Sequence, residues 1–192
     1  MTKYKFEQIP NLLVIPKRFS EVEFDEGTNS DVRQLCNNFI DNFDAYYDQG
    51  IAPVLTGPPG LGKSYAAAVM AKQLYYDLKV PVFWADTVTI LNRLMDHKDF
   101  RSPDYFKLKD LIIKTPIIVL DDFGHMQEFS RSKELFLEIV NSRYASKRPT
   151  IMTMNHPLQK PDPETLWEYV ANAVGAAVTR RINLMAGDLL LA

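Results

Sequence analysis

The chain of 192 residues has only one cysteine, Cys36, so it cannot form an internal disulfide. A lone cysteine favours a reducing compartment, and we expect a cytoplasmic protein. No run approaches the roughly 18 apolar residues that a membrane-spanning helix needs, and the amino terminus lacks the apolar core of a signal peptide. The sequence therefore predicts no contact with a membrane.

The chain also lacks a large excess of charge of either sign. It has 24 acidic residues and 22 lysines and arginines, which give a net charge of −2. Such a chain has no global attraction to nucleic acid, so contact with DNA must come from local basic patches or from the assembly of several copies. The sequence also has no internal repeat and no low-complexity tract. Its length and its 46% hydrophobic content fit a single domain with one sizeable core.

Short apolar runs alternate with helical patterns over most of the chain. Buried strands are expected at 52–56, 81–85, 116–121 and 149–154, and helices at 63–78, 87–96 and 131–145. This alternation predicts an α/β fold with a parallel sheet that is covered on both faces.

The two ends of the chain are less regular. Residues 1–27 hold two prolines and are interpreted as an amino-terminal arm with a short strand at most, followed by a domain over 28–192. An amphipathic helix is expected at 30–48, after the arm. The apolar end, residues 187–192, is either a fifth strand or a loose tail.

The segment TGPPGLGKS, residues 56–64, lies between an apolar run and an alanine-rich helical pattern and fits the phosphate-loop motif G-x-x-x-x-G-K-[ST]. Its glycines let backbone N–H groups surround an anion, and the next helix adds the positive end of its dipole. Lys63 is then the cation for the β- and γ-phosphates of ATP, and Ser64 is a ligand of Mg²⁺. The alternative is a glycine and proline turn followed by a lysine by chance. The residues expected to bind the nucleotide are Gly57, Pro58, Pro59, Gly60, Leu61, Gly62, Lys63, Ser64 and Tyr65.

A pair of carboxylates ends the apolar run IIVLDDFG, residues 117–124. A nucleotide-hydrolysing parallel sheet needs an acid at the carboxyl end of a strand beside the phosphate loop. We therefore expect Asp121 to face the Mg²⁺ shell and Asp122 to orient or deprotonate the attacking water. The alternative is a strand end with two solvated acids.

Asn155 ends the next apolar run, PTIMTM. If the two strands are neighbours, its side chain lies beside the γ-phosphate. On its own, an asparagine at this place is more often a turn residue, because its side chain bonds local backbone readily.

The chain resembles the AAA+ ATPases of the DnaC and IstB group in four segments, which occur in the order GPPGLGKS, IIVLDDFG, NSRYASKRPTIMTMNHP and VTRRINLM. This group comprises bacterial replicative helicase loaders and transposition helper ATPases. The resemblance covers about residues 14–192, because VIPKRFSEVEF also looks like the group's entry into its ATPase domain. It implies that Asp121 is the Mg²⁺-associated acid, Asp122 the catalytic acid and Asn155 the sensor 1 residue. It also implies a sheet with the strand order 5-1-4-3-2.

Arg181 looks like the arginine finger of this group, which reaches the nucleotide of a neighbouring subunit in a spiral or ring. Either Arg180 or Arg181 could hold this place, or both could be solvated cations on the last helix. The chain departs from the group's pattern in two ways: only the short arm precedes the ATPase segment, and we expect no helical lid after the arginines.

The resemblance implies an ATPase that uses Mg²⁺ and converts ATP to ADP and phosphate. The leading hypothesis is a helicase loader that assembles with ATP and helps to place a replicative helicase on single-stranded DNA. A second is a transposition helper of the IstB kind, which assembles on duplex DNA and stimulates a transposase. A third is an adaptor that binds nucleotide and hydrolyses it poorly, against which the presence of both Asp121 and Asp122 argues.

Overall fold

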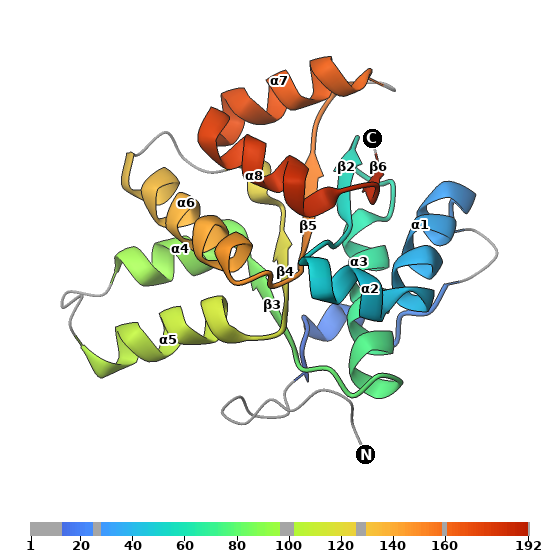
Figure 1. Cartoon of the computed structure of the whole chain (residues 1–192), viewed down its shortest axis with the longest axis horizontal. Coiled ribbons are helices and arrows are strands. Elements are labelled where there is room, and N and C mark those ends of the chain that lie inside the picture. The colour runs from blue at the N-terminus through green and yellow to red at the C-terminus, as the bar shows by residue number, and fades with distance from the viewer. Residues whose placement is uncertain (1–12, 25–27, 97–101, 126–129, 159–160, 192) are drawn as a thin grey trace.

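One parallel sheet runs through the computed structural model, which describes residues 13–24, 28–96, 102–125, 130–158 and 161–191. Within these ranges the sheet has six strands in the order β1-β3-β4-β5-β2-β6 (Figure 1). The strands are β1 Leu13–Val14, β2 Val54–Gly57, β3 Val82–Asp86, β4 Ile117–Asp121, β5 Thr150–Asn155 and β6 Leu190–Leu191.

The predicted strand order is confirmed. Counted from the strand before the phosphate loop, the order β6, β2, β5, β4, β3 is 5-1-4-3-2, and β1 adds an edge strand beside β3. The apolar end of the chain forms the fifth strand, because β6 pairs in parallel with β2. The register places Gly57 beside Asn155 and Asp86 beside Asp121, so these strands end at the same edge of the sheet.

Eight α-helices lie within the described ranges. They are α1 Ser30–Asp41, α2 Phe43–Gln49, α3 Lys63–Tyr76, α4 Thr87–Met95, α5 Pro103–Lys114, α6 Ser130–Ala145, α7 Pro163–Val174 and α8 Ala176–Ala186, and two short 3-10 helices span Lys17–Phe19 and Phe123–His125. None of the helices in these ranges is both long and apolar enough to cross a lipid bilayer.

The prediction of one continuous helix at 30–48 was wrong, because two helices, α1 and α2, occupy this range. The chain breaks at Asn42, whose backbone leaves the helical region at φ −110° and ψ 23° and whose side chain donates to the carbonyl of Asn38. An asparagine competes with helix hydrogen bonds in this way because its side chain can bond nearby backbone.

Sequence reasoning missed α5 and α7, although both begin with a recognisable signal. Ser102 and Asp162 each accept a backbone N–H three residues along the chain, and a proline follows at the first helical position in both cases. A polar cap followed by proline is a typical helix start.

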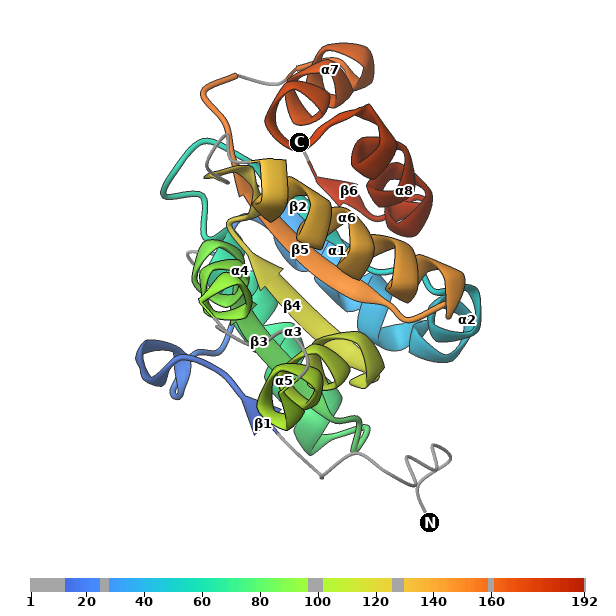
Figure 2. The same ribbon diagram turned by 90° about the vertical axis from the view of Figure 1, so that its left-hand side faces the viewer.

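The helices cover both faces of the sheet, as the alternating pattern predicts. In Figure 1, α1, α2 and α3 lie on one side of the strands, and Figure 2 shows α4, α5 and α6 in front of the strands with α1 and α2 behind them. Successive residues of β4 point into two cores: Ile117 and Val119 pack with α1 and α3, while Ile118 and Leu120 pack with α4 to α8. Close packing of α3 is possible because buried alanines, Ala66, Ala67, Ala68 and Ala71, face the neighbouring elements.

Arg143 on α6 is a cation inside the protein with 0% exposure. Its guanidinium donates to Thr150 Oγ1 and to five backbone carbonyls, those of Ile112, Ile113, Thr115, Pro116 and Pro149. Burial lowers its pKa to about 9. The side chain thereby joins the turn before β4 to the turn before β5, at the edge of the sheet away from the phosphate loop.

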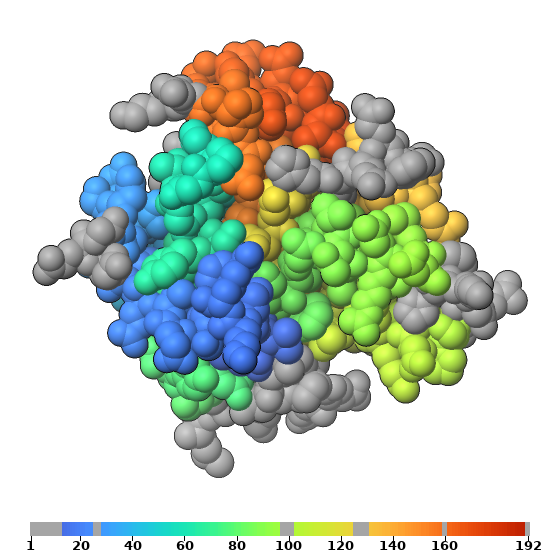
Figure 3. Space-filling view, turned by 180° about the vertical axis from the view of Figure 1, so that it is seen from behind, coloured from blue at the N-terminus to red at the C-terminus, as the bar shows by residue number. Residues whose placement is uncertain are grey.

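The described part of the arm, residues 13–24, packs on the sheet and on α3. Strand β1 pairs in parallel with β3, and the Lys72 ammonium on α3 donates to the carbonyl of Val22 over 2.9 Å. Figure 3 shows this blue segment on the surface beside the teal residues that begin α3. Residues 1–12 and 25–27 lie outside the described ranges, and the division into an arm and a domain stays a prediction.

Candidate functional site

The phosphate loop connects β2 to α3 at the carboxyl edge of the sheet. Gly60 and Gly62 have φ of 86° and 79°, a left-handed conformation that side-chain-bearing residues rarely adopt. The N-cap residue of α3, Gly62, has no side-chain cap in the part of the chain that the structure describes, so the first backbone N–H groups are available to an anion. The loop therefore has the backbone geometry that its motif predicts.

Lys63 begins α3 and lies under the loop with 5% exposure. Its ammonium donates to the carbonyls of Gly57 over 2.9 Å and Pro58 over 2.8 Å. Burial lowers the pKa of Lys63, and the charges of Asp122 and Asp121 partly oppose that effect. Because both hydrogen-bond acceptors are neutral carbonyls, the ammonium can exchange them for phosphate oxygens, which hold it more strongly.

Ser64 and Asp121 meet at the base of the loop. The Ser64 hydroxyl donates to Asp121 Oδ1 over 2.7 Å, and the hydroxyl of Thr153 donates to the same oxygen over 2.6 Å. The Arg18 guanidinium lies 4.0 Å from the other oxygen, Oδ2. A hydroxyl and a carboxylate oxygen side by side are the hard ligands that Mg²⁺ takes.

Asp122 lies where the chain turns away from β4, in a left-handed conformation with φ 55°. Its backbone N–H donates to Thr153 Oγ1 over 2.9 Å, and the Asn155 amide donates to its carboxylate over 3.1 Å. A non-glycine residue in this conformation costs on the order of 1 kcal/mol, and such strain is concentrated at functional sites. The turn aims the Asp122 carboxylate toward Asn155, and the paired strands β4 and β5 place these two side chains together.

Sequence reasoning missed Thr153 and Thr87, which hold the Asp121–Asp122 turn from both sides. Thr153 bonds the side chain of Asp121 and the backbone of Asp122, while the Thr87 hydroxyl donates to the Asp121 carbonyl over 2.9 Å. A signal for Thr153 existed, because it is a polar residue inside the apolar run PTIMTM and shares a strand face with Asn155.

His156 is a further residue that sequence reasoning did not place at the site. It has 2% exposure, its backbone N–H donates to the Gly57 carbonyl over 3.1 Å, and its ring contacts the edge of Tyr169. Burial and the nearby charge of Lys63 lower its pKa. The surroundings of the ring therefore favour its neutral form.

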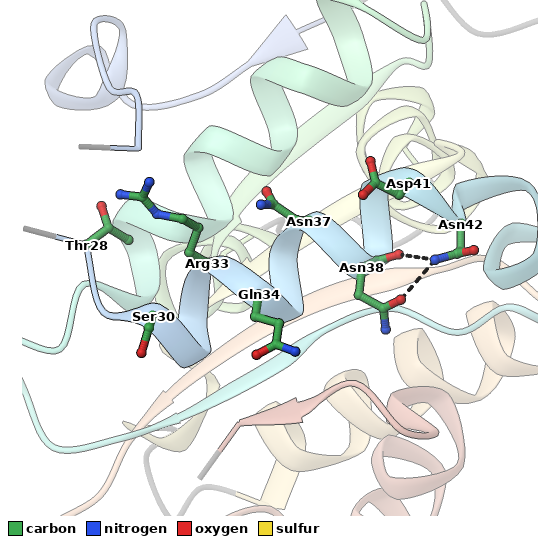
Figure 4. Close-up of a pocket in the computed structure, with 8 residues that line it drawn as sticks. All are labelled: Thr28, Ser30, Arg33, Gln34, Asn37, Asn38, Asp41 and Asn42. Atoms are coloured by element: carbon green, nitrogen blue, oxygen red, sulfur yellow. Dashed lines mark hydrogen bonds between the residues drawn. The ribbon is translucent and has the colours of Figure 1, made fainter. Parts of the chain in front are cut away.

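Two hollows lie near the start of α1. One of about 350 Å³, beside the phosphate loop, is lined by Thr28, Asn29, Val32, Gly60, Leu61, Gly62 and Tyr65. The other, of about 750 Å³, follows the exposed face of α1 (Figure 4) and is lined by Thr28, Ser30, Arg33, Gln34, Asn37, Asn38, Asp41 and Asn42. Three loop residues, Gly60, Leu61 and Gly62, line the first hollow, whereas the second is lined only by polar side chains and by no residue of the loop.

Arg181 is not part of this constellation within one copy of the chain. Its guanidinium donates to the carbonyl of Ala177, one turn earlier on α8, over 2.7 Å. Arg180 beside it is exposed. The structure brings Lys63, Ser64, Asp121, Asp122 and Asn155 together and leaves both arginines of α8 on a separate helix.

No group of three or more histidine, cysteine, aspartate or glutamate side chains that could hold a metal lies within the described ranges. A Mg²⁺ ion bound with ATP needs no such group, because it takes one or two protein oxygens together with phosphate oxygens and water. Ser64 and Asp121 fit that demand.

The family described as IstB-like ATP binding protein matches residues 5–179 of the chain. The chain is also similar to the replicative helicase loader DnaC of Escherichia coli strain K12, with 25% identity over 140 residues. That match covers 73% of this chain and 54% of the relative, so the chain spans about half the length of the curated relatives it matches.

The chain is also similar to several solved structures. The crystal structure of the DnaC helicase loader superposes with a TM-score of 0.79 and 25% identity over 92% of this chain and 100% of that one. DnaI follows with a TM-score of 0.67 and 23% identity over 90% and 92% of the two chains. DnaA from Aquifex aeolicus, bound to AMPPCP, has a TM-score of 0.61 and 15% identity over 84% and 46%. The last two are evidence for the fold alone.

Proposed function

The chain belongs to the family of IstB-like ATP-binding proteins, within the DnaC and IstB group of AAA+ ATPases, and from this premise we propose that it hydrolyses ATP with Mg²⁺ and acts as a helicase loader. One observation carries the ATPase part: Ser64 and Asp121 touch below the phosphate loop, and Asp122 and Asn155 touch beside it. These are the two positions where such a site needs a metal-associated acid and a residue that orients water.

Each side chain has a defined task in this proposal. Lys63 transfers its hydrogen bonds from loop carbonyls to the β- and γ-phosphates of ATP. Ser64 and Asp121 would hold Mg²⁺, which would offset phosphate charge. Asp122 accepts a hydrogen bond from the attacking water or takes its proton, and Asn155 holds the Asp122 carboxylate in place. The products are ADP and phosphate.

The substitution Asp122→Asn is expected to keep ATP bound and to slow hydrolysis by about 10²–10⁴-fold, because an amide keeps the shape of the carboxylate but cannot accept a proton from water. Phosphate release measures turnover, and titration with a fluorescent ATP analogue measures binding. Asp77→Asn, an exposed acid at the end of α3, is the control and should match the parent protein. If Asp122→Asn turned over ATP at the parental rate, the catalytic acid would lie elsewhere. If the parent protein itself released no phosphate, the result would support the hypothesis of an adaptor that binds nucleotide and hydrolyses it poorly.

The loader role is supported by the similarity to DnaC over most of this chain. Co-purification from the native host, followed by identification of the bound protein, tests it. A replicative helicase in the eluate would support the proposal. A transposase would instead support the second candidate, an IstB-like helper, which the name of the matching family favours.

DNA binding is expected to need ATP-driven assembly rather than one copy, because the net charge of −2 provides no chain-wide attraction. Lys147 and Arg148 lie between α6 and β5, at the edge of the sheet away from the phosphate loop, and several copies would align these cations. Fluorescence anisotropy with labelled single-stranded and duplex DNA should show affinity that rises with protein concentration and falls with salt. Tight binding by a proven monomer, insensitive to salt, would contradict this expectation.

A further inference from the structure

We propose that Arg18 is a latch between the arm and the metal site: its guanidinium and Mg²⁺ compete for the Asp121 carboxylate, and Mg²⁺ that binds with ATP displaces Arg18. The arm segment that would respond spans residues 17–24. This inference rests on the proposed function, because it requires that Ser64 and Asp121 hold Mg²⁺.

The two oxygens of Asp121 have different surroundings. Oδ1 accepts hydrogen bonds from Ser64 over 2.7 Å and Thr153 over 2.6 Å, while Oδ2 has Arg18 at 4.0 Å. The Asp121 side chain is 6% exposed and that of Arg18 is 70% exposed. Arg18 therefore covers the open side of a carboxylate whose other side is enclosed by hydroxyls.

Mg²⁺ and the guanidinium cannot both remain close to this carboxylate without repulsion. Mg²⁺ binds oxygen at about 2.0–2.1 Å, far closer than Arg18 lies, and carries twice the charge. An ion pair with such an exposed arginine is weak because water and salt screen it. The metal is therefore expected to win the competition, and Arg18 to move away.

A displacement of Arg18 would disturb the contact between the aromatic rings of Phe19 and Trp84. The guanidinium lies over the ring of Phe19, 4.7 Å from its centre, and that ring lies 5.4 Å from the ring of Trp84 on β3. Trp84 itself is buried at 6% exposure. Its fluorescence can therefore report whether Phe19 stays in place.

The far end of the segment is attached to α3 independently of Arg18. Lys72 donates to the Val22 carbonyl over 2.9 Å, the Glu23 N–H donates to the Tyr65 hydroxyl over 3.3 Å, and that hydroxyl donates back to the Glu23 carbonyl. Tyr65 directly follows Ser64 in the chain. The movement should therefore be a local opening around residues 17–19, with residues 22–24 held in place.

The test uses the full chain with Trp167→Phe, which leaves Trp84 as the only tryptophan of the two in the sequence. Mg²⁺ is titrated into protein saturated with a non-hydrolysable ATP analogue while Trp84 emission is followed. We expect an emission change in this protein. In Arg18→Gln most of the emission change should be absent, and the midpoint of Mg²⁺ binding, measured for parent and variant by calorimetry, should fall about two- to five-fold, as loss of a weak ion pair predicts. High salt should shrink the difference in midpoint.

Lys17→Gln is the matched control, because it removes a neighbouring exposed cation and should titrate like the parent. Arg18→Lys keeps the charge and should retain the parental midpoint. Calorimetry measures binding of Mg²⁺ and the analogue separately. If the parent binds both but Arg18→Gln has the same midpoint and the same emission change, the latch is wrong while the proposed function stands. If calorimetry shows no binding to the parent, both fail.

Discussion

Lys63→Ala is expected to lose ATP affinity by on the order of 100-fold or more while the domain stays folded. A charged hydrogen-bond donor to phosphate is removed, and such bonds are among the strong ones. The fold should tolerate the change, because among the described residues the ammonium bonds only the Gly57 and Pro58 carbonyls of its own loop, and burial already lowers its pKa. Titration with a fluorescent ATP analogue measures affinity, and thermal unfolding measures stability.

The control for this substitution is Lys72→Met, two turns further along α3. Lys72 donates to the arm at Val22 and does not reach the phosphate loop, so this variant should bind ATP like the parent. Unchanged affinity in a folded Lys63→Ala protein would remove the basis of the nucleotide site as we describe it.

Arg181→Ala is expected to bind ATP nearly normally and to hydrolyse it about 10³–10⁵-fold more slowly, the range that arginine fingers contribute. A guanidinium is permanently charged and offers a planar set of donors that suits the charge on a transferring phosphoryl group. Within one copy, Arg181 bonds its own helix at Ala177 and does not contact the phosphate loop. If Arg181 is an arginine finger, it must therefore act on the nucleotide of a second copy of the chain.

Mixing two inactive variants tests this shared site. Arg181→Ala keeps an intact loop and Lys63→Ala keeps an intact arginine, so mixed interfaces should restore part of the phosphate release. Arg180→Ala, which removes the exposed neighbour, should have the milder effect. A mixture that stayed inactive despite verified co-assembly would refute the shared site, as would isolated monomers that hydrolysed ATP at the full rate.

Both predictions depend on a site whose main residues are singled out by sequence patterns. The phosphate loop is continuous in the chain, so its glycines, Lys63 and Ser64 specify a local geometry without help from distant segments. Asp121 and Asn155 follow apolar runs, and the carboxyl ends of parallel strands share one edge of a sheet. Pattern and elementary geometry thus place all three elements at one edge of the sheet.

The order of the strands came from the family resemblance, since apolar runs alone do not say which strands are neighbours. Only the tertiary structure revealed the contacts that depend on that order. Thr153 reaches Asp121 because β5 lies next to β4, and Arg18 reaches the same carboxylate because the arm returns along the outer edge of β3.

By itself, the sequence determined the α/β class, the parallel sheet, the phosphate loop and the two acidic residues, because each depends on short-range periodicity or on adjacent residues. Tertiary structure decided which oxygen of Asp121 each neighbour takes, where the arm lies, and that Arg143 is buried among carbonyls rather than solvated. Those outcomes depend on atoms from segments far apart in the chain, and no local pattern encodes the distances between segments before they pack.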